Sequence, residues 1–199
     1  MARRREFSED VVRAAARDQF LAGGYAGTSV DELTAATGLS RSSLYGAFGD
    51  KHDLFLQTLD EYRFAKTAEM RDGLRGPNGT AYTRLGAYVR QFAQDVAADV
   101  ERKGCLMAKS AAELAASDPD VAEKASEMLH LMRDELCACV VDAQAEGSLD
   151  ADADPEQLAN MLLAVLRGLL ALGKGGMEPE AITGAAAQAL AVLPPARLP

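Results

Sequence analysis

The polar side chains best suited to binding a charged partner are concentrated in one short stretch, "TGLSRSSLYGAFGDK", residues 37–51. It combines serine hydroxyls with the guanidinium of Arg41, the phenol of Tyr45 and the ammonium of Lys51. These groups can donate hydrogen bonds to phosphate oxygens and to the edges of bases. A catalytic loop would normally bring a nucleophile together with a base, and a buried helix would not expose so many polar groups. The stretch therefore predicts a surface that binds nucleic acid.

Other residues that could perform chemistry do not combine into a recognisable site. The three cysteines are an odd number, so we expect thiols rather than a disulfide framework. Cys137 and Cys139 stand two apart on a predicted helix and point in different directions, so they do not form a metal-binding pair. His52 and His130 have no serine, cysteine or carboxylate partner at a familiar spacing. We therefore expect no metal, no cofactor and no enzymatic activity.

Charge is distributed unevenly along the 199 residues, whose net charge is -9. Residues 1–52 hold seven Lys or Arg against seven Asp or Glu, whereas residues 53–199 hold fourteen against twenty-three. An acidic protein repels phosphate, but the net negative charge lies entirely in the second part. The cluster Arg3–Arg5 could act as an arm near phosphates or simply as a solvated start.

Composition also places the chain in a compartment. No run of about 18 apolar residues is visible, and the basic start lacks the apolar middle of a signal peptide. We expect a cytoplasmic protein without a membrane segment.

The elements that position the polar stretch are predicted to be helices. Alanine, leucine and charged residues dominate and alternating β-branched runs are missing, which indicates an all-α fold. The first helix begins at Ser8, repeats Val12, Ala16 and Phe20 every four residues, and stops at the glycine pair 23–24.

Two short helices follow. Ser29 and Glu32 have the spacing of a capping box, and Gly38 closes the helix that they begin. Ser40 then caps a third helix whose residues Leu44 and Phe48 face inward. Arg41, Ser42 and Tyr45 occupy the opposite surface. Two short helices joined by a tight glycine turn form a helix-turn-helix, in which the second helix enters the major groove of DNA.

Six further helices complete a predicted total of about nine. A domain of residues 1–52 is expected to bind DNA, and a domain of residues 53–199 is expected to form a helical body. The predicted helices of this body span residues 51–71, 81–103, 106–116, 119–145, 156–172 and 178–192.

The order of elements and the segment "AGGYAGTSVDELTAATGLSRSSLYGAFGDKHDLF" resemble the TetR family of transcriptional regulators. The resemblance covers about residues 8–56. The segment "GCLMAKSAAEL", residues 104–114, is similar to one found in a large branch of the family. The positions at the family's spacing are Gly24, Tyr25, Thr28, Gly38, Leu44, Tyr45, Phe48 and Lys51.

The resemblance implies a DNA-binding regulator, typically a repressor, that recognises a palindromic operator. It also implies that Thr28, Tyr45 and Lys51 contact phosphates. Arg41, Ser42 and Ser43 are our candidates for reading base edges, because the N-terminal residues of a recognition helix approach the bases. The whole predicted DNA-binding set is Thr28, Ser29, Ser40, Arg41, Ser42, Ser43, Tyr45 and Lys51.

The body is expected to dimerise and to bind an effector, as the resemblance implies. The homodimer would use the last two helices, although their apolar face could instead be taken up by the protomer's own core. The predicted face holds Leu158, Met161, Leu162, Val165, Leu166, Leu169 and Leu170, with Ala185, Ala189 and Ala191 for close packing. A small apolar molecule is the expected effector. Its predicted contacts, which could equally be ordinary core residues, are Tyr88, Phe92, Met107, Met128, Leu131 and Met132.

Cys105 is a second candidate for effector control. It follows Gly104 at a predicted helix N-terminus with Arg102 and Lys103 just upstream, and such surroundings lower the pKa of a thiol. A redox sensor and a buried structural cysteine are both compatible with this pattern. For the whole chain, the alternatives are a helical homodimeric interaction protein with a vestigial DNA-binding head and a small helical enzyme.

Overall fold

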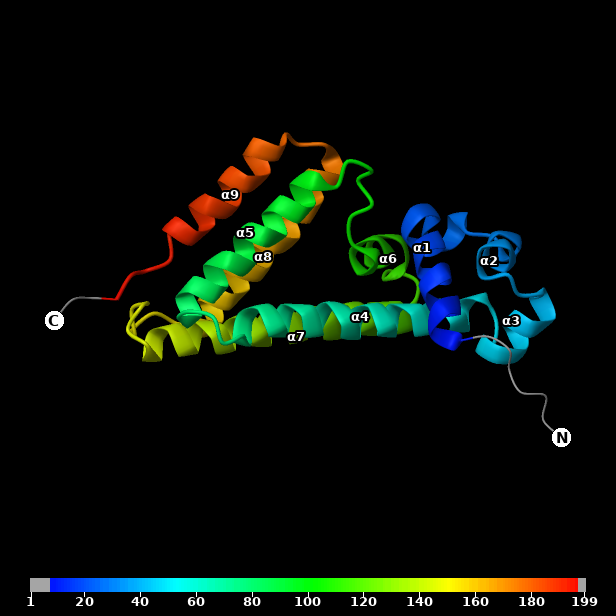
Figure 1. Cartoon of the computed structure of the whole chain (residues 1–199), viewed down its shortest axis with the longest axis horizontal. Helices are drawn as coiled ribbons and strands as arrows, with labels where there is room; N and C mark the ends of the chain where they lie inside the picture. The colour runs from blue at the N-terminus through cyan, green and yellow to red at the C-terminus, as the bar shows by residue number, and fades with distance from the viewer. Residues whose placement is uncertain (1–7, 197–199) are drawn as a thin grey trace. The chain divides into compact units, whose positions relative to one another are not determined.

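The computed structural model describes residues 8–196, where nine α-helices and one isolated β-bridge, Leu149 to Pro195, are the regular elements (Figure 1). The predicted all-α fold is confirmed, while the arginine cluster at residues 3–5 lies outside the described part. The helices are α1 (Glu9–Gly27), α2 (Val30–Thr37), α3 (Arg41–Phe48), α4 (Lys51–Arg75), α5 (Ala81–Ala98), α6 (Leu106–Leu114), α7 (Pro119–Ala145), α8 (Pro155–Gly175) and α9 (Pro179–Ala191).

Packing divides the chain into two compact units. The head unit runs to Phe64 and also takes in Cys105–Ala125. The body unit comprises Ala65–Gly104 and the chain from Ser126 onward. The domain boundary expected after residue 52 therefore does not coincide with the packing boundary. The first part of α4, the whole of α6 and the start of α7 belong to the head unit.

The core of the head unit forms where α1 packs against both α2 and α6. Val12, Ala16 and Phe20 are buried, as their four-residue spacing predicted. The ring of Phe20 meets that of Phe55 edge to face, with centroids 4.9 Å apart, and Leu33 of α2 is fully buried. Aromatic pairs in this geometry stabilise a core beyond the area that they bury.

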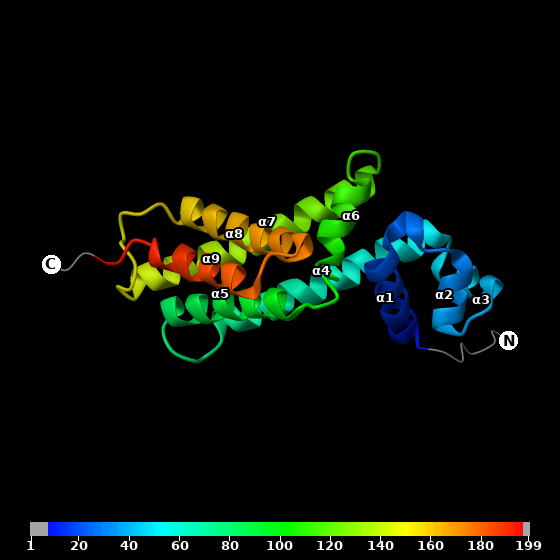
Figure 2. The same cartoon turned by 90° about the horizontal axis from the view of Figure 1, so that it is seen from above.

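In the body unit, α5, α8 and α9 pack on one another, as Figures 1 and 2 show from two directions. Elsewhere in this unit, α4 and α7 are joined through Glu135, whose side chain is only 6% exposed. Its two carboxylate oxygens each lie 2.7 Å from the Nε of an arginine, Arg71 or Arg75, on α4. Two cations offset the cost of burying this carboxylate.

The ends of α4 and α5 are among those that differ from the sequence prediction. The helix predicted to end at residue 71 continues to Arg75, so Gly73 lies inside α4, where a Cβ would stand 3.2 Å from Cδ2 of Tyr88. This glycine provides room for an aromatic ring instead of ending the helix. The fifth helix stops at Ala98, five residues early, because the Asp99 carboxylate accepts a hydrogen bond from the amide of Gly104 and folds the chain into a turn.

The apolar surface of α8 also differs from the predicted face. Leu162, Leu166 and Leu169 are buried within the protomer's own body unit. The exposed surface is a neighbouring stripe of mostly small residues, and only 22% of the most apolar 18-residue window of α8 is buried. By length and composition this helix could cross a membrane, but the same surface can instead be covered by another protein. The exposed stripe consists of Ala164, Gly168, Ala171, Leu172 and Gly175.

Candidate nucleic-acid interface

The start of α2 is fixed by a complete capping box. Ser29 Oγ accepts a hydrogen bond from the amide of Glu32 at 3.2 Å, and Glu32 Oε2 accepts one from the amide of Ser29 at 2.7 Å. Hydrogen bonding from the Ser29 backbone lowers the pKa of the Glu32 carboxyl. At the other end, Gly38 adopts φ 68°, in the left-handed region that glycine enters without strain. The two ends of α2 are thus set by local sequence, as predicted.

The third helix presents a polar face on a buried base. Leu44 and Phe48 are 1% and 3% exposed, so they anchor α3 in the head unit. Arg41, Ser42 and Tyr45 are exposed on the other side, which is the arrangement expected of a recognition helix.

Hydroxyl groups gather at the N-terminus of α3. Ser40 Oγ accepts a hydrogen bond from the amide of Ser43 at 3.2 Å and lies 3.0 Å and 2.9 Å from the hydroxyl oxygens of Ser42 and Ser43. The main structural role of the Ser40 side chain is therefore to cap α3. The exposed hydroxyls of Ser42 and Ser43 stand at the positive end of a helix, where anions and acceptor groups are favoured.

Arg41 pairs with an acidic neighbour on α2. Its Nη2 lies 3.0 Å from Oδ1 of Asp31 on α2, and both side chains are largely exposed. An exposed ion pair of this kind contributes about 0–1 kcal/mol, so the arginine can exchange its partner at small cost.

Lys51 begins α4 and is placed by an aromatic ring. Its ammonium lies 4.3 Å from the ring centroid of Tyr25, a cation-π contact. The Tyr25 ring in turn packs 4.8 Å from that of Phe55, centroid to centroid. Burial of the Tyr25 ring raises the pKa of its phenol. The position of the Lys51 ammonium thus depends on the position of the Tyr25 ring.

Thr28 has a structural role that corrects the expected one. Its side chain is 2% exposed, and its hydroxyl donates to the carbonyl of Gly24 at 2.7 Å. Because the single hydroxyl proton is used inside the protein, this side chain is not placed to donate to phosphate. Thr28 closes the turn between α1 and α2.

A contact that sequence reasoning missed joins the start of α4 to the start of α7. Nε2 of His52 lies 2.7 Å from Oδ2 of Asp118, and the other oxygen of that carboxylate accepts hydrogen bonds from the amides of Asp120 and Val121. The segment "SDPD", residues 117–120, is typical of a helix cap, but nothing in the sequence indicates a contact with a histidine 66 residues away. The hydrogen bond from His52 lowers the pKa of Asp118.

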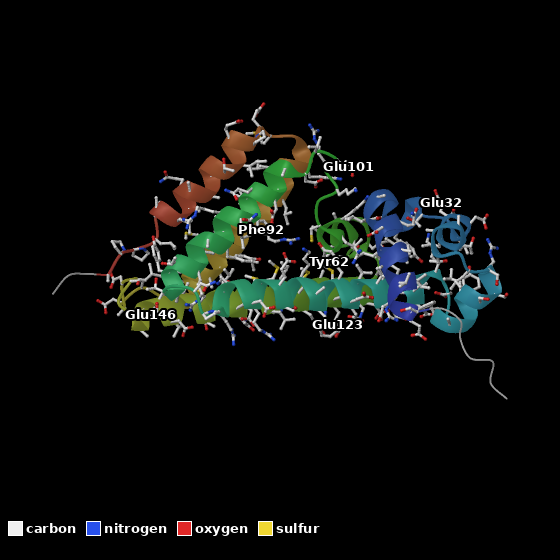
Figure 3. All side chains as sticks on the ribbon, viewed as in Figure 1. Glu32, Tyr62, Phe92, Glu101, Glu123 and Glu146 are labelled. Atoms are coloured by element: carbon white, nitrogen blue, oxygen red, sulfur yellow. The ribbon has the colours of Figure 1, made fainter. Side chains whose placement is uncertain are left out.

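The residues proposed for effector binding are divided between the two units. Met107 is buried in the head unit, whereas Tyr88, Phe92, Met128, Leu131 and Met132 belong to the body unit. Figure 3 marks Phe92 on α5, where its ring centroid lies 6.3 Å from that of Tyr88. Burial, with a smaller effect from Glu69, raises the pKa of Tyr88 to about 12.

The three cysteines, all within the described residues, are thiols outside any disulfide. Cys105 is buried at the N-cap of α6 in the head unit. Burial raises the pKa of Cys139 to about 11 and also raises that of Cys137. Metal-type clusters of three or more His, Cys, Asp or Glu are absent from residues 8–196.

Comparison with known proteins agrees with this geometry. Residues 12–58 match the family model "Bacterial regulatory proteins, tetR family", and residues 81–189 match "Tetracyclin repressor-like, C-terminal domain". The HTH-type transcriptional regulator YezE of Bacillus subtilis is 30% identical over 81% of this chain and 84% of its own length. The HTH-type transcriptional repressor ComR of Escherichia coli is 26% identical over 94% of this chain and 90% of its own.

A solved structure of similar fold contains DNA. A cysteine mutant of the TetR-family regulator CifR, in complex with a 26-base-pair operator, aligns with a TM-score of 0.78 and 29% identity over 97% of this chain and all of that one. The fold and the polar face of α3 define a helix-turn-helix DNA-binding protein. The chain belongs to the TetR family of transcriptional regulators, whose members are dimers with a ligand-binding C-terminal domain.

The contact between His52 and Asp118 predicts a pH-dependent contribution to stability. Because the pKa of Asp118 is depressed below the usual 3.8, its contribution is present above about pH 4 and is lost as pH falls through the folded-state pKa. We expect Asp118→Asn to be less stable than the wild type at neutral pH and to lose less stability on acidification. Chemical denaturation from pH 7 to pH 3 measures this, with Asp120→Asn as the control for removing one charge from α7. Parallel pH profiles of the wild type and Asp118→Asn would contradict it.

Proposed function

We propose that this regulator is a repressor that places α3 in the major groove of each half of a palindromic operator. The observation that carries the proposal is the exposed polar face of α3, held on the buried side chains of Leu44 and Phe48. A dimer presents two such helices related by a two-fold axis, and an inverted repeat in DNA has the same symmetry. We place the protein in the cytoplasm, where its operator lies, and propose no enzymatic activity.

The contacts with DNA fall into two groups. Tyr45 and Lys51 are proposed to bind phosphates, because Tyr45 is exposed on α3, the half-buried Lys51 begins the helix that follows it, and both side chains carry a donor. Arg41, Ser42 and Ser43 are proposed to face base edges. For Arg41 this requires exchange of the Asp31 carboxylate for a guanine or a phosphate. Ser29 and Ser40 support these contacts as helix caps.

The exposed stripe of α8 is proposed as the dimer surface, together with α9. A Cβ built on Gly168, Gly175 or Gly184 would meet no atom within 4 Å, so these positions are open in one protomer. Small residues allow two helix backbones to approach closely, and the apolar surface of α8 then leaves water. The expected participants from α9 are the exposed residues Ala185 and Ala191.

Release from the operator is proposed to follow an event in the body or on α6. One candidate is a small apolar ligand that contacts Tyr88, Phe92, Met128, Leu131 and Met132. Such a ligand releases the protein from DNA only if it binds more tightly to the conformation that fits DNA poorly. The other candidate is modification of Cys105. The raised pKa values of Cys137 and Cys139 disfavour their reactive thiolates, and Cys105 is proposed for this role from its place at the N-cap of α6.

Substitutions in α3 and α4 should separate reading from positioning. We expect Arg41→Ala to lose about 1–3 kcal/mol of discrimination at one base pair of each half-site. Lys51→Ala should weaken binding to all sequences and lower the salt dependence by about one phosphate contact. Selection from random duplex DNA followed by affinity titrations at several salt concentrations measures both, with Arg133→Ala in the body unit as the control. Failure of the wild type to enrich any inverted repeat would instead favour an interaction protein with a vestigial head.

A charge placed in the α8 stripe should prevent dimerisation. We expect Ala171→Arg to sediment as a monomer, because an unpaired cation buried in an apolar interface is strongly unfavourable. Ala151→Arg adds the same charge at an exposed turn outside the stripe and should remain a dimer. Sedimentation at several protein concentrations distinguishes the two. An unchanged dimer of Ala171→Arg would place the interface elsewhere.

Mild oxidation tests the two routes of release. If Cys105 carries the signal, we expect oxidation to release wild-type protein and Cys139→Ser from operator DNA while Cys105→Ser stays bound, because only that variant lacks the thiol at the start of α6. Band-shift titrations before and after reduction measure this. Operator binding by all three proteins after oxidation would exclude Cys105 and leave the apolar ligand as the proposed effector.

A further inference from the structure

The break in α1 separates groups that a continuous helix would pair. Gly24 adopts φ 78° and ψ 178°, which is not helical. In an uninterrupted helix, the amide of Tyr25 would donate to the carbonyl of Leu21, and the amide of Ala26 to that of Ala22. The break therefore leaves two carbonyls before it and two amides after it in need of other partners.

Lys109 of α6 binds the two carbonyls. Its Nζ donates to the carbonyl of Leu21 at 3.0 Å and to that of Ala22 at 2.8 Å. These carbonyls form the negative end of the first segment of α1, where a cation is electrostatically favoured.

Glu113, one helical turn further along α6, binds the two amides. Its Oε2 accepts from Tyr25 N at 3.0 Å, and its Oε1 accepts from Ala26 N at 2.7 Å. The amides form the positive start of the short turn that follows the break, where a carboxylate is favoured. The two side chains of α6 thus cap both sides of one break with matching charges.

Glycine at position 24 is needed for this arrangement for two reasons. Its positive φ is strained for other residues. A Cβ would also stand 2.6 Å from Oε2 of Glu113 and 3.4 Å from Cε of Lys109. The break and the two caps therefore fit together closely.

The chain that follows the break carries the DNA-binding elements. The ring of Tyr25 contacts the ammonium of Lys51. The turn that the Thr28 hydroxyl closes is followed directly by Ser29, the N-cap of α2. A shift of the residues after the break would move Lys51 and the start of α2 together. The geometry of the break is thus a condition for that of the helix-turn-helix.

We propose that Lys109 and Glu113 are positioning residues that hold the head in the geometry that binds DNA, although they touch no DNA themselves. The inference rests on the proposed function as an operator-binding regulator. It gives α6 a specific role, because any displacement of this helix withdraws both caps at once. Cys105 is the N-cap of the same helix, so a change there would act on the helix that holds the break.

The first test measures the caps directly, without DNA. In folded protein at neutral pH, Glu113→Ala should increase amide hydrogen exchange at Tyr25 and Ala26 by roughly tenfold or more, the equivalent of losing a hydrogen bond to a charged group. Glu113→Gln keeps one acceptor oxygen and should give an intermediate increase. Glu123→Ala, an exposed carboxylate of the same head unit marked in Figure 3, is the matched control and should change neither amide.

The second test measures affinity for the operator that the wild type selects and for unrelated duplex DNA. Glu113→Ala and Lys109→Met should each lose roughly tenfold in operator affinity. Glu113→Ala removes a negative charge, so it should bind unrelated DNA at least as well as the wild type. If Glu113 acted only through its charge, Glu113→Ala would bind both DNAs more tightly than the wild type. A general loss of folding in this variant would weaken binding to both DNAs.

The outcomes separate this inference from the proposed function. A wild type that selects no operator contradicts the proposed function and with it this inference. A wild type that selects one, with faster exchange but unchanged operator affinity in the variants, overturns only the positioning role. If Glu113→Ala does not fold, Glu113→Gln decides, because it preserves size and one acceptor. Wild-type operator affinity of Glu113→Gln together with faster exchange would also overturn the proposal.

Discussion

The head unit depends on one backbone constraint, the interruption of α1 at Gly24. A continuous helix would pair all its internal amides and carbonyls and would carry the chain straight on. The glycine redirects the chain toward α2, but this is tolerable only because other groups take the unpaired hydrogen bonds. Lys109 and Glu113 do so from α6, and the Thr28 hydroxyl closes the turn. The break in α1 therefore depends on a contact with Glu113, which lies 88 residues from Tyr25 along the chain.

Electrostatics explains how an acidic chain can serve a DNA-binding function. Several acidic residues of the head unit accept hydrogen bonds from backbone amides at helix starts: Glu32 completes a capping box, Glu113 caps the break in α1 and Asp118 caps the start of α7. Carboxylates engaged in this way neutralise the partial positive charge of helix starts. On α3, the exposed hydroxyls of Ser42 and Ser43 lie beside the Ser40 hydroxyl, and the Arg41 guanidinium lies beside the Asp31 carboxylate.

Helix α8 illustrates what the periodicity of apolar residues can and cannot decide. The sequence of α8 is apolar around most of its circumference, so it predicted both burial and a dimer surface without telling the two faces apart. The structure packs Leu162, Leu166 and Leu169 inside the protomer and leaves the stripe around Gly168 open. The choice depends on α5 and α9, which cover one face of α8 and whose positions are not encoded in α8 itself.

By itself, the sequence determined the local features of the head: the Ser29 and Ser40 caps, the Gly38 turn and the division of α3 into buried and exposed faces. These follow from interactions within three or four residues, where side-chain type and spacing fix the geometry. Only the tertiary structure decided that Thr28 is buried, that Gly73 makes room for Tyr88, and that His52 meets Asp118. Each of these depends on which distant segment packs nearby, and the local pattern of one chain segment carries no information about that neighbour.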